Sequence, residues 1–209
     1  EGAFSQAFIP IYSEYQEHKS TEEIKDFINN LAGTLLSFLF IFTIIALFFA
    51  PIFIFIFAPG FYFDPLKKDL AVNVLRIMFP YLGLISLVAF AGGIQNSHQR
   101  FSLPAATPII FNLCIILSAC FLAPLFSIPI VGLAWGVLLA GIIQLLIQLA
   151  PLSQIDRLPI PKIGMSNEGV KKVFILMLPA VIAGGVAQIN LLIDTVFASL
   201  LITGSPTWL

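Results

Sequence analysis

The chain has 209 residues, of which 59% are hydrophobic and 10% are charged, and its mean hydropathy is +1.01. An average soluble domain carries about 25% charged residues. This chain therefore lacks the polar shell of a soluble protein, and its composition indicates an integral membrane protein. The net charge of −1 excludes the basic field that a nucleic-acid-binding protein needs, so no nucleic acid partner is expected.

The first predicted element, residues 1–15, is a helix that starts without an initiator Met or an N-cap residue. Apolar residues recur on one face at steps of three and four: Phe4, Phe8, Ile11 and Tyr15. At 1.5 Å per residue the helix spans roughly 22 Å, about half a bilayer crossing or a little more. We therefore expect the sequence to be a fragment that starts inside a transmembrane helix and is cut at both ends.

Five further stretches are apolar over a length close to the roughly 20 residues that a bilayer-spanning helix needs. In chain order they are residues 31–57, 71–95, 108–126, 130–150 and 173–202. Their apolar runs are too long for barrel strands and lack the alternation that a barrel requires. The sequence predicts an all-α fold, a polytopic integral membrane helical bundle.

Basic residues are distributed unequally between the two sides of this bundle. One side holds seven of them, in the segment after Tyr15, the 95–107 turn and the 151–172 loop: Lys19, Lys25, Arg100, Arg157, Lys162, Lys171 and Lys172. The other side holds three: Lys67, Lys68 and Arg76. Because cytoplasmic loops carry the excess of Lys and Arg, the first side is predicted to be cytoplasmic.

The last predicted span contains a carboxylate, which is costly in lipid and is therefore a candidate functional group. Small and polar residues fall within about half of its helical wheel: Gly184, Ala187, Gln188, Asn190, Asp194, Thr195 and Ser199. For the amides a packing face is the favoured interpretation. For Asp194 a function is favoured, with a bound sodium ion as its partner, because hard cations take carboxylate oxygens.

The 130–150 span carries a different pattern. Small residues and amides form one row at steps of four: Gly132, Gly136, Ala140, Gln144 and Gln148. This spacing predicts a helix contact seam. No nucleophile-elbow, zinc-protease or phosphate-loop motif occurs, and His98 has no visible partner. The sequence indicates a transporter rather than an enzyme.

Five segments, in order along the chain, carry a family resemblance: "EGAFSQAFIPIYSEY", "FAPGF", "FPYLGLISL", "QNSHQRFSLPAATPIIFN" and "SPTW". They resemble the MurJ (MviN) family of lipid II flippases, and the first segment and the Arg-Phe-x-x-Pro-Ala-x-x-Pro turn are specific to that family. The resemblance implies a two-lobe flippase or exporter fold, of which this chain holds the part from the cytoplasmic half of the second helix to the seventh helix.

The resemblance also implies how the chain is divided and what it does. Residues 1–150 would form most of the first lobe, 151–169 the cytoplasmic inter-lobe loop, and 170–209 the first helix of the second lobe. The family moves lipid II, an undecaprenyl-pyrophosphate-linked peptidoglycan precursor, across the bacterial cytoplasmic (inner) membrane by alternating access. Lipid II and membrane lipids are then the expected partners, and the transporter is expected to be monomeric with no tightly bound cofactor.

Site residues follow from the same resemblance. Glu1 and Thr207 match family positions that line the transport cavity or its gate, and Gln188 and Asn190, which share the polar face of the last span with Asp194, are further candidates for the cavity or gate. Asp194 matches a carboxylate that in some members is similar to a sodium ligand. The family's substrate-binding arginines lie at positions outside this chain.

Two alternatives remain open at the level of the sequence. A cation-coupled multidrug exporter of the same superfamily would lack cavity arginines in its first helix. A membrane enzyme acting on polyprenyl-linked sugars would need a catalytic carboxylate or histidine motif outside residues 1–209.

Overall fold

The computed structural model describes residues 2–200, apart from the side chains at 2, 3, 187, 190 and 198–200. Within these residues there are helices and no strands, which confirms the all-α prediction. The helices are α1 (Gly2–His18), α2 (Thr21–Phe57), α3 (Pro59–Tyr62), α4 (Pro65–Ser97), α5 (Ser102–Leu117), α6 (Pro129–Gln154) and α7 (Glu168–Leu200). A π-helical turn (Ser118–Leu122) and a 3₁₀ turn (Ala123–Leu125) extend α5.

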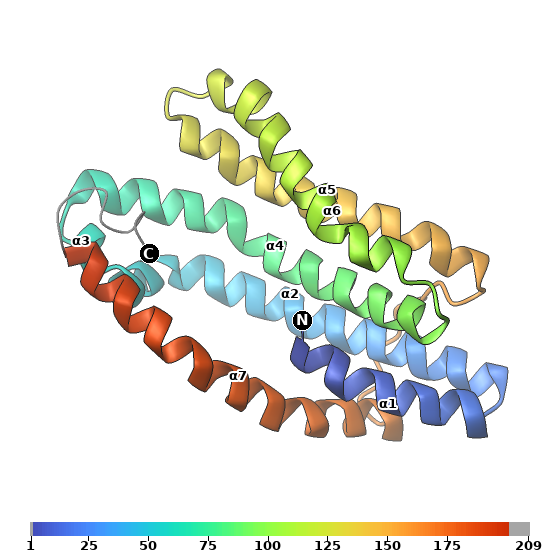
Figure 1. The fold of residues 1–209 in the computed structure, drawn as a ribbon. Coiled ribbons are helices and arrows are strands. Elements are labelled where there is room, and N and C mark those ends of the chain that lie inside the picture. Colours follow the sequence, from blue (N-terminus) through green and yellow to red (C-terminus); the bar gives the residue numbers. More distant parts are fainter. Residues whose placement is uncertain (1, 201–209) are drawn as a thin grey trace.

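Five helical segments in the described part of the chain are long and apolar enough to cross a membrane, as predicted. They are Thr21–Phe57, Pro65–Ser97, Ser102–Leu125, Pro129–Gln154 and Glu168–Val186, the last of these being the first part of α7. In Figure 1 the α1–α2 turn, the α4–α5 turn and the connection from α6 to α7 lie at one end of the bundle. The helix α3 and the α5–α6 turn lie at the opposite end, so the connections are grouped at two ends as the predicted spans require.

The structure corrects three predicted boundaries. The turn predicted at 95–107 is shorter, because α4 continues to Ser97 and α5 begins at Ser102. Pro104 lies in the first turn of α5, where a missing N–H breaks no helical hydrogen bond. The span predicted at 108–126 ends in the π and 3₁₀ turns rather than as a continuous α-helix. The loop predicted at 151–172 is confined to residues 155–167.

Helix α2 is specified at its start by a complete capping box. The Ser20 hydroxyl accepts a hydrogen bond from the Glu23 N–H, and the Glu23 carboxylate accepts one from the Ser20 N–H. Farther along, Pro51 has no N–H to donate to the Leu47 carbonyl. The Nε of Arg76 on α4 donates to that carbonyl at 3.2 Å instead. Arg76 therefore satisfies a backbone group that the proline leaves free within the membrane.

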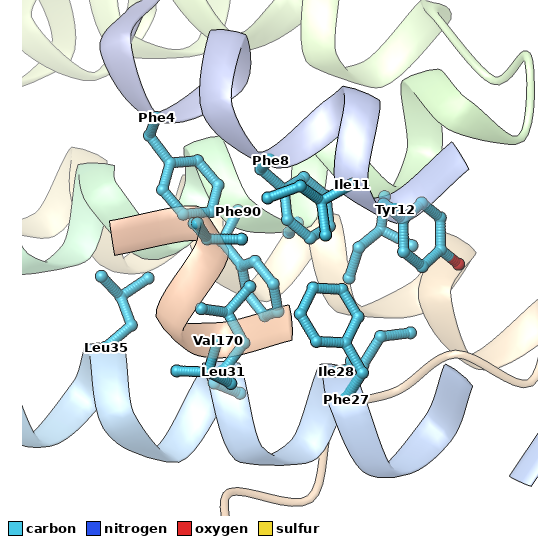
Figure 2. Close-up of a cluster of buried hydrophobic side chains, with 14 of the residues drawn as sticks. Phe4, Phe8, Ile11, Tyr12, Phe27, Ile28, Leu31, Leu35, Phe90 and Val170 are labelled. Carbon is cyan, nitrogen blue, oxygen red and sulfur yellow. The ribbon is translucent and has the colours of Figure 1, made fainter. Parts of the chain in front are cut away.

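The apolar stripe of α1 is the centre of the buried core, as its periodicity predicts (Figure 2). Phe8 is fully buried, with its ring centroid 5.3 Å from that of Phe4 and 5.2 Å from that of Tyr12. Phe90 of α4 packs edge-on against Phe8 at 5.5 Å. Val170 and other residues of α2 and α7 complete the cluster, so α1 joins the start of α7 to the bundle.

The predicted contact seam of α6 is confirmed. Its members are all buried: Gly132, Gly136, Ala140, Gln144 and Gln148. A methyl group at Gly132 would lie 2.7 Å from the Ala123 Cα, and one at Gly136 would collide with the Ser118 side chain. The small residues thus allow α6 to approach the end of α5 closely.

The 155–167 connection is fastened to the start of α2. The side-chain oxygen of Asn29 accepts from the Ile160 N–H at 2.7 Å, and its backbone carbonyl accepts from the Lys162 N–H at 3.0 Å. Lys25 forms an ion pair with Asp156 at the same end. Because Gly33 has no side chain, the Lys162 backbone packs directly on α2. A methyl group added at Gly33 would lie 2.6 Å from the Lys162 backbone nitrogen and even closer to the Lys162 carbonyl group.

Candidate functional site

Helix α7 carries three of the five predicted site residues, Gln188, Asn190 and Asp194, and is anchored near its first turn. The Asn167 side-chain oxygen caps it by accepting from the Gly169 and Val170 N–H groups. A methyl group at Gly169 would lie 2.6 Å from the Tyr15 hydroxyl, and Val170 and Val173 are buried. Beyond this anchor the described side chains of α7 are mostly exposed, and the helix curves along the outside of the bundle to reach α3 (Figure 1).

The structure places two of the five predicted site residues. Gln188 and Asp194 are both exposed on α7. They are about 9 Å apart along the helix axis and about 120° apart around it, so they do not form one cluster. Glu1 and Thr207 lie outside the described residues, as does the side chain of Asn190.

Asp194 lies in the last two turns of α7 and makes no ion pair with any described residue. Arg76, the nearest basic candidate in the sequence, is hydrogen-bonded to the Leu47 carbonyl. The described residues contain no group of three or more His, Cys, Asp or Glu side chains that could hold a metal ion. One carboxylate fits a hard cation chemically, but the remaining oxygen ligands would have to come from other groups.

A buried amide network connects α4, α5 and α6. Gln95 donates to the side-chain oxygen of Gln148, and Gln148 donates to the Thr107 hydroxyl at 3.2 Å. Gln144 donates to the Thr107 carbonyl at 2.8 Å, while its own side-chain oxygen has no hydrogen-bond partner among the described residues. Helix spacing placed Gln144 and Gln148 on a seam, but Gln95 carried no pattern that would have assigned it to the network.

A cavity of about 330 Å³ lies beside this network. Ser5 of α1, Asn96 of α4, and Thr107 and Gln148 contribute polar atoms to its wall. Small residues of α4, including Gly92 and Gly93, leave the space open between α1 and α5. The helical bundle therefore contains a polar-walled crevice near its predicted cytoplasmic end.

His98 has partners after all, which corrects the prediction that it has none. Its Nε2 lies 2.9 Å from the Tyr12 hydroxyl and 3.2 Å from the Gln16 amide nitrogen. Because an amide nitrogen only donates, Nε2 is the acceptor, and the neutral ring carries its proton on Nδ1. Burial lowers the pKa of His98 below its ordinary 6.5, and the nearby Arg157 and Arg100 charges lower it further.

This geometry predicts a pH dependence of stability. The unfolded chain binds a proton at His98 more readily than the folded protein does. The contribution of the neutral ring is therefore complete above pH 6.5 and is lost as the pH falls through the lowered folded-state pKa. Acidification from about pH 7.5 to about pH 5.5 should lower the melting temperature by about 2 °C more in the parent than in His98→Gln. The same substitution at the exposed His18 should leave the acid sensitivity intact; equal sensitivity in the parent and His98→Gln would contradict this assignment.

Comparisons with known proteins agree along the whole chain. The family model described as "Lipid II flippase MurJ" matches residues 1–209. The chain is 42% identical over 209 residues to the probable lipid II flippase MurJ of Buchnera aphidicola subsp. Acyrthosiphon pisum, covering 100% of this chain and 41% of that protein. It is 37% identical over 213 residues to the lipid II flippase MurJ of Burkholderia cenocepacia, covering 100% of this chain and 41% of that protein.

A solved structure, "Lipid II flippase MurJ, inward closed conformation", superposes with a TM-score of 0.78 at 29% identity. The match covers 99% of this chain and 42% of the solved one. The chain thus spans about two-fifths of the length of the relatives that it matches.

Proposed function

The chain belongs to the lipid II flippase MurJ family, and from that premise we propose that it forms part of a transporter for lipid II. The transported molecule is an undecaprenyl-pyrophosphate-linked peptidoglycan precursor, which crosses the bacterial cytoplasmic membrane by alternating access without being chemically changed. The observation that carries the proposal is the family match over all 209 residues, in a chain whose described part contains five helical segments long and apolar enough to cross a membrane.

The packing of α7 supports a two-lobe transport mechanism. Only the start of this helix is buried against α1 and α2, and its remaining described length is mostly exposed. Between this buried start and its contact with α3 the helix is mostly exposed and contains Pro179, so a change in its angle to the first lobe would break mainly the α3 contact. We assign residues 1–150 to most of the first lobe, 151–169 to the inter-lobe connection and 170–209 to the start of the second lobe.

The polar residues of α7 fit a water-accessible path next to this hinge. A pyrophosphate needs hydrated or cationic surroundings, whereas its prenyl tail can stay in the bilayer. Gln188 and Asn190 are assigned to the cavity wall, with Glu1 and Thr207 as cavity or gate residues. Asp194 is assigned as one ligand of a coupling sodium ion, with further oxygens supplied from outside the described residues. The transporter is taken to act as a monomer.

Complementation tests the transport proposal. The complete gene is expressed in a bacterium whose own lipid II flippase is depleted, because the chain covers only about two-fifths of its relatives. We expect growth and cell shape to be restored, as they should be by the Burkholderia cenocepacia relative used as a control. Failure of a membrane-inserted, well-expressed product under conditions where the control succeeds would refute the proposal.

A further inference from the structure

His98 joins the end of α1 to the α4–α5 turn at the predicted cytoplasmic end of the bundle. It is the C-cap residue of α4, and its Nε2 accepts from the Tyr12 hydroxyl at 2.9 Å and from the Gln16 amide at 3.2 Å. The Tyr12 ring belongs to the buried core (Figure 2), and the Arg157 guanidinium lies beside its hydroxyl. Among the described residues, no other side-chain hydrogen bond or ion pair connects α1 to residues 98–101. The imidazole ring is therefore the polar link between α1 and the turn.

The two sides of this link are held by different neighbours. The end of α1 lies against α2, where the Tyr15 ring stacks on Phe27 with the centroids 4.5 Å apart. The turn is tied to α6 instead, because the Arg100 guanidinium donates to the Gln154 side-chain oxygen at 2.8 Å. Loss of the His98 bonds would thus free the turn from α1 without pulling α1 away from α2.

Two positive charges act on the His98 ring, that of Arg157 and, more weakly, that of Arg100. Arg157 comes from the connection after α6, and its Nε is buried without a hydrogen bond to any described residue. Helices α5 and α6 contain no charged side chain. Asp156, the carboxylate next to Arg157 in sequence, is paired with Lys25 of α2. The described residues therefore offer a neutral ring two donors but offer a protonated ring no carboxylate.

A proton on Nε2 would change this arrangement in two ways. Nε2 would become a donor, so the Gln16 N–H could no longer bond to it, and the Tyr12 hydroxyl would have to turn its oxygen towards it. Rotation of the hydroxyl and a flip of the amide can accommodate that change. The added charge has no such remedy, because it would face two guanidinium groups in a partly buried site. Charge repulsion, more than the loss of hydrogen bonds, would therefore drive the ring out into water.

We propose that His98 forms, with Tyr12 and Gln16, a proton-operated latch between α1 and the α4–α5 turn. While the ring is neutral, the latch holds the turn against α1. When the ring is protonated, the latch opens and the turn moves outward with the start of α5. Arg157 is a positioning residue in this latch, since its charge opposes protonation of the closed form. The latch does not depend on which molecule the protein transports.

Proton linkage gives the direction of the effect. Burial and the two arginines hold the pKa of His98 below its ordinary 6.5 in the closed form, whereas a ring released into water would return towards that value. Protons therefore favour the open form. Its population should rise as the pH falls below 6.5 and should level off below the pKa of the closed form. Each unit between the two pKa values changes the ratio of open to closed protein by about tenfold.

Distances between spin labels test the latch in the protein expressed from its complete gene. One label replaces the exposed His18 at the end of α1, and the other replaces the exposed Ser102 at the start of α5. Between about pH 7.5 and about pH 5, we expect a population with a longer distance to grow at least about threefold. A second pair, at Ser102 and the exposed Ser153 of α6, should keep its distance, because the turn moves together with α6. A first pair whose distances do not change over this range would overturn the proposal.

Variants identify the sensor and the positioning residue. His98→Gln keeps an acceptor that does not titrate, so it should remove the acid response, whereas the permanent charge of His98→Lys should give the longer distance already at about pH 7.5. Arg157→Gln should make the response smaller and let it level off at a higher pH, because the closed form would then oppose protonation less. Arg157→Lys keeps the charge and should keep the response. The Ser102–Ser153 distance reports whether each variant is correctly folded. A response that persists in His98→Gln would place the sensor elsewhere and refute the latch, and one that is identical in Arg157→Gln would refute the role of Arg157.

Discussion

Replacing Gly33 with alanine is expected to release the 155–167 connection from α2 and to destabilise the protein by about 3 kcal/mol or more. The added methyl group would overlap the Lys162 backbone, which cannot move away as a flexible side chain can. Overpacking a well-packed site typically costs about 1–3 kcal/mol, and a backbone clash lies at or beyond the upper end of that range. We expect an apparent melting temperature lower by about 5 °C or more, measured in detergent on the product of the complete gene.

Gly83→Ala is the matched control. Gly83 is also inside a long helix, but the atoms nearest to its added methyl group would be 3.7 and 3.9 Å away, in ordinary van der Waals contact. Alanine is a better helix former than glycine, so this variant should be neutral or more stable by up to about 1 kcal/mol. Limited trypsin digestion supplies a second measurement, because release of the connection should speed cleavage after Lys162 in Gly33→Ala alone. Unchanged melting and cleavage would mean that the connection is not docked on α2.

The spans and the main packing faces were predictable because their signals are local. Apolar length fixes which segments cross a bilayer, and the 3.6-residue period places Phe4, Phe8 and Ile11 on the buried face of α1. The four-residue row from Gly132 to Gln148 predicted the α6 seam for the same reason. The end of the 95–107 turn was predicted wrongly, because α5 already begins at Ser102 and Pro104 fits inside its first turn.

Contacts between distant parts of the chain were not predictable from these patterns. Tyr12 and Gln16 meet His98 across more than 80 residues, and Arg76 reaches the Leu47 carbonyl from another helix. The sequence of the connection after α6 predicts only a loop. In the structure, Asn29 accepts hydrogen bonds from its backbone, and Gly33 leaves room for that backbone to pack on α2. Such pairings depend on how helices are arranged in space. The helical wheel predicted that Gln188 and Asp194 lie on one helix, but it cannot predict which groups bind them.

Replacing Asp194 with alanine is expected to abolish sodium-dependent stabilisation and to reduce lipid II flipping. A carboxylate at this depth is costly unless it is paired, and no described residue forms an ion pair with it. A ligand present at about 100 times its Kd stabilises the folded state by about 2.7 kcal/mol, so sodium should raise the parent melting temperature by several degrees relative to potassium. The difference should vanish in Asp194→Ala and be partly kept in Asp194→Asn, because an amide oxygen can still coordinate a hard cation. Gln188→Ala, about 9 Å away along the helix axis, should retain the sodium effect. If sodium stabilises Asp194→Ala as much as the parent, the carboxylate is a hydrogen-bonded packing group, and the coupling ion must be bound elsewhere.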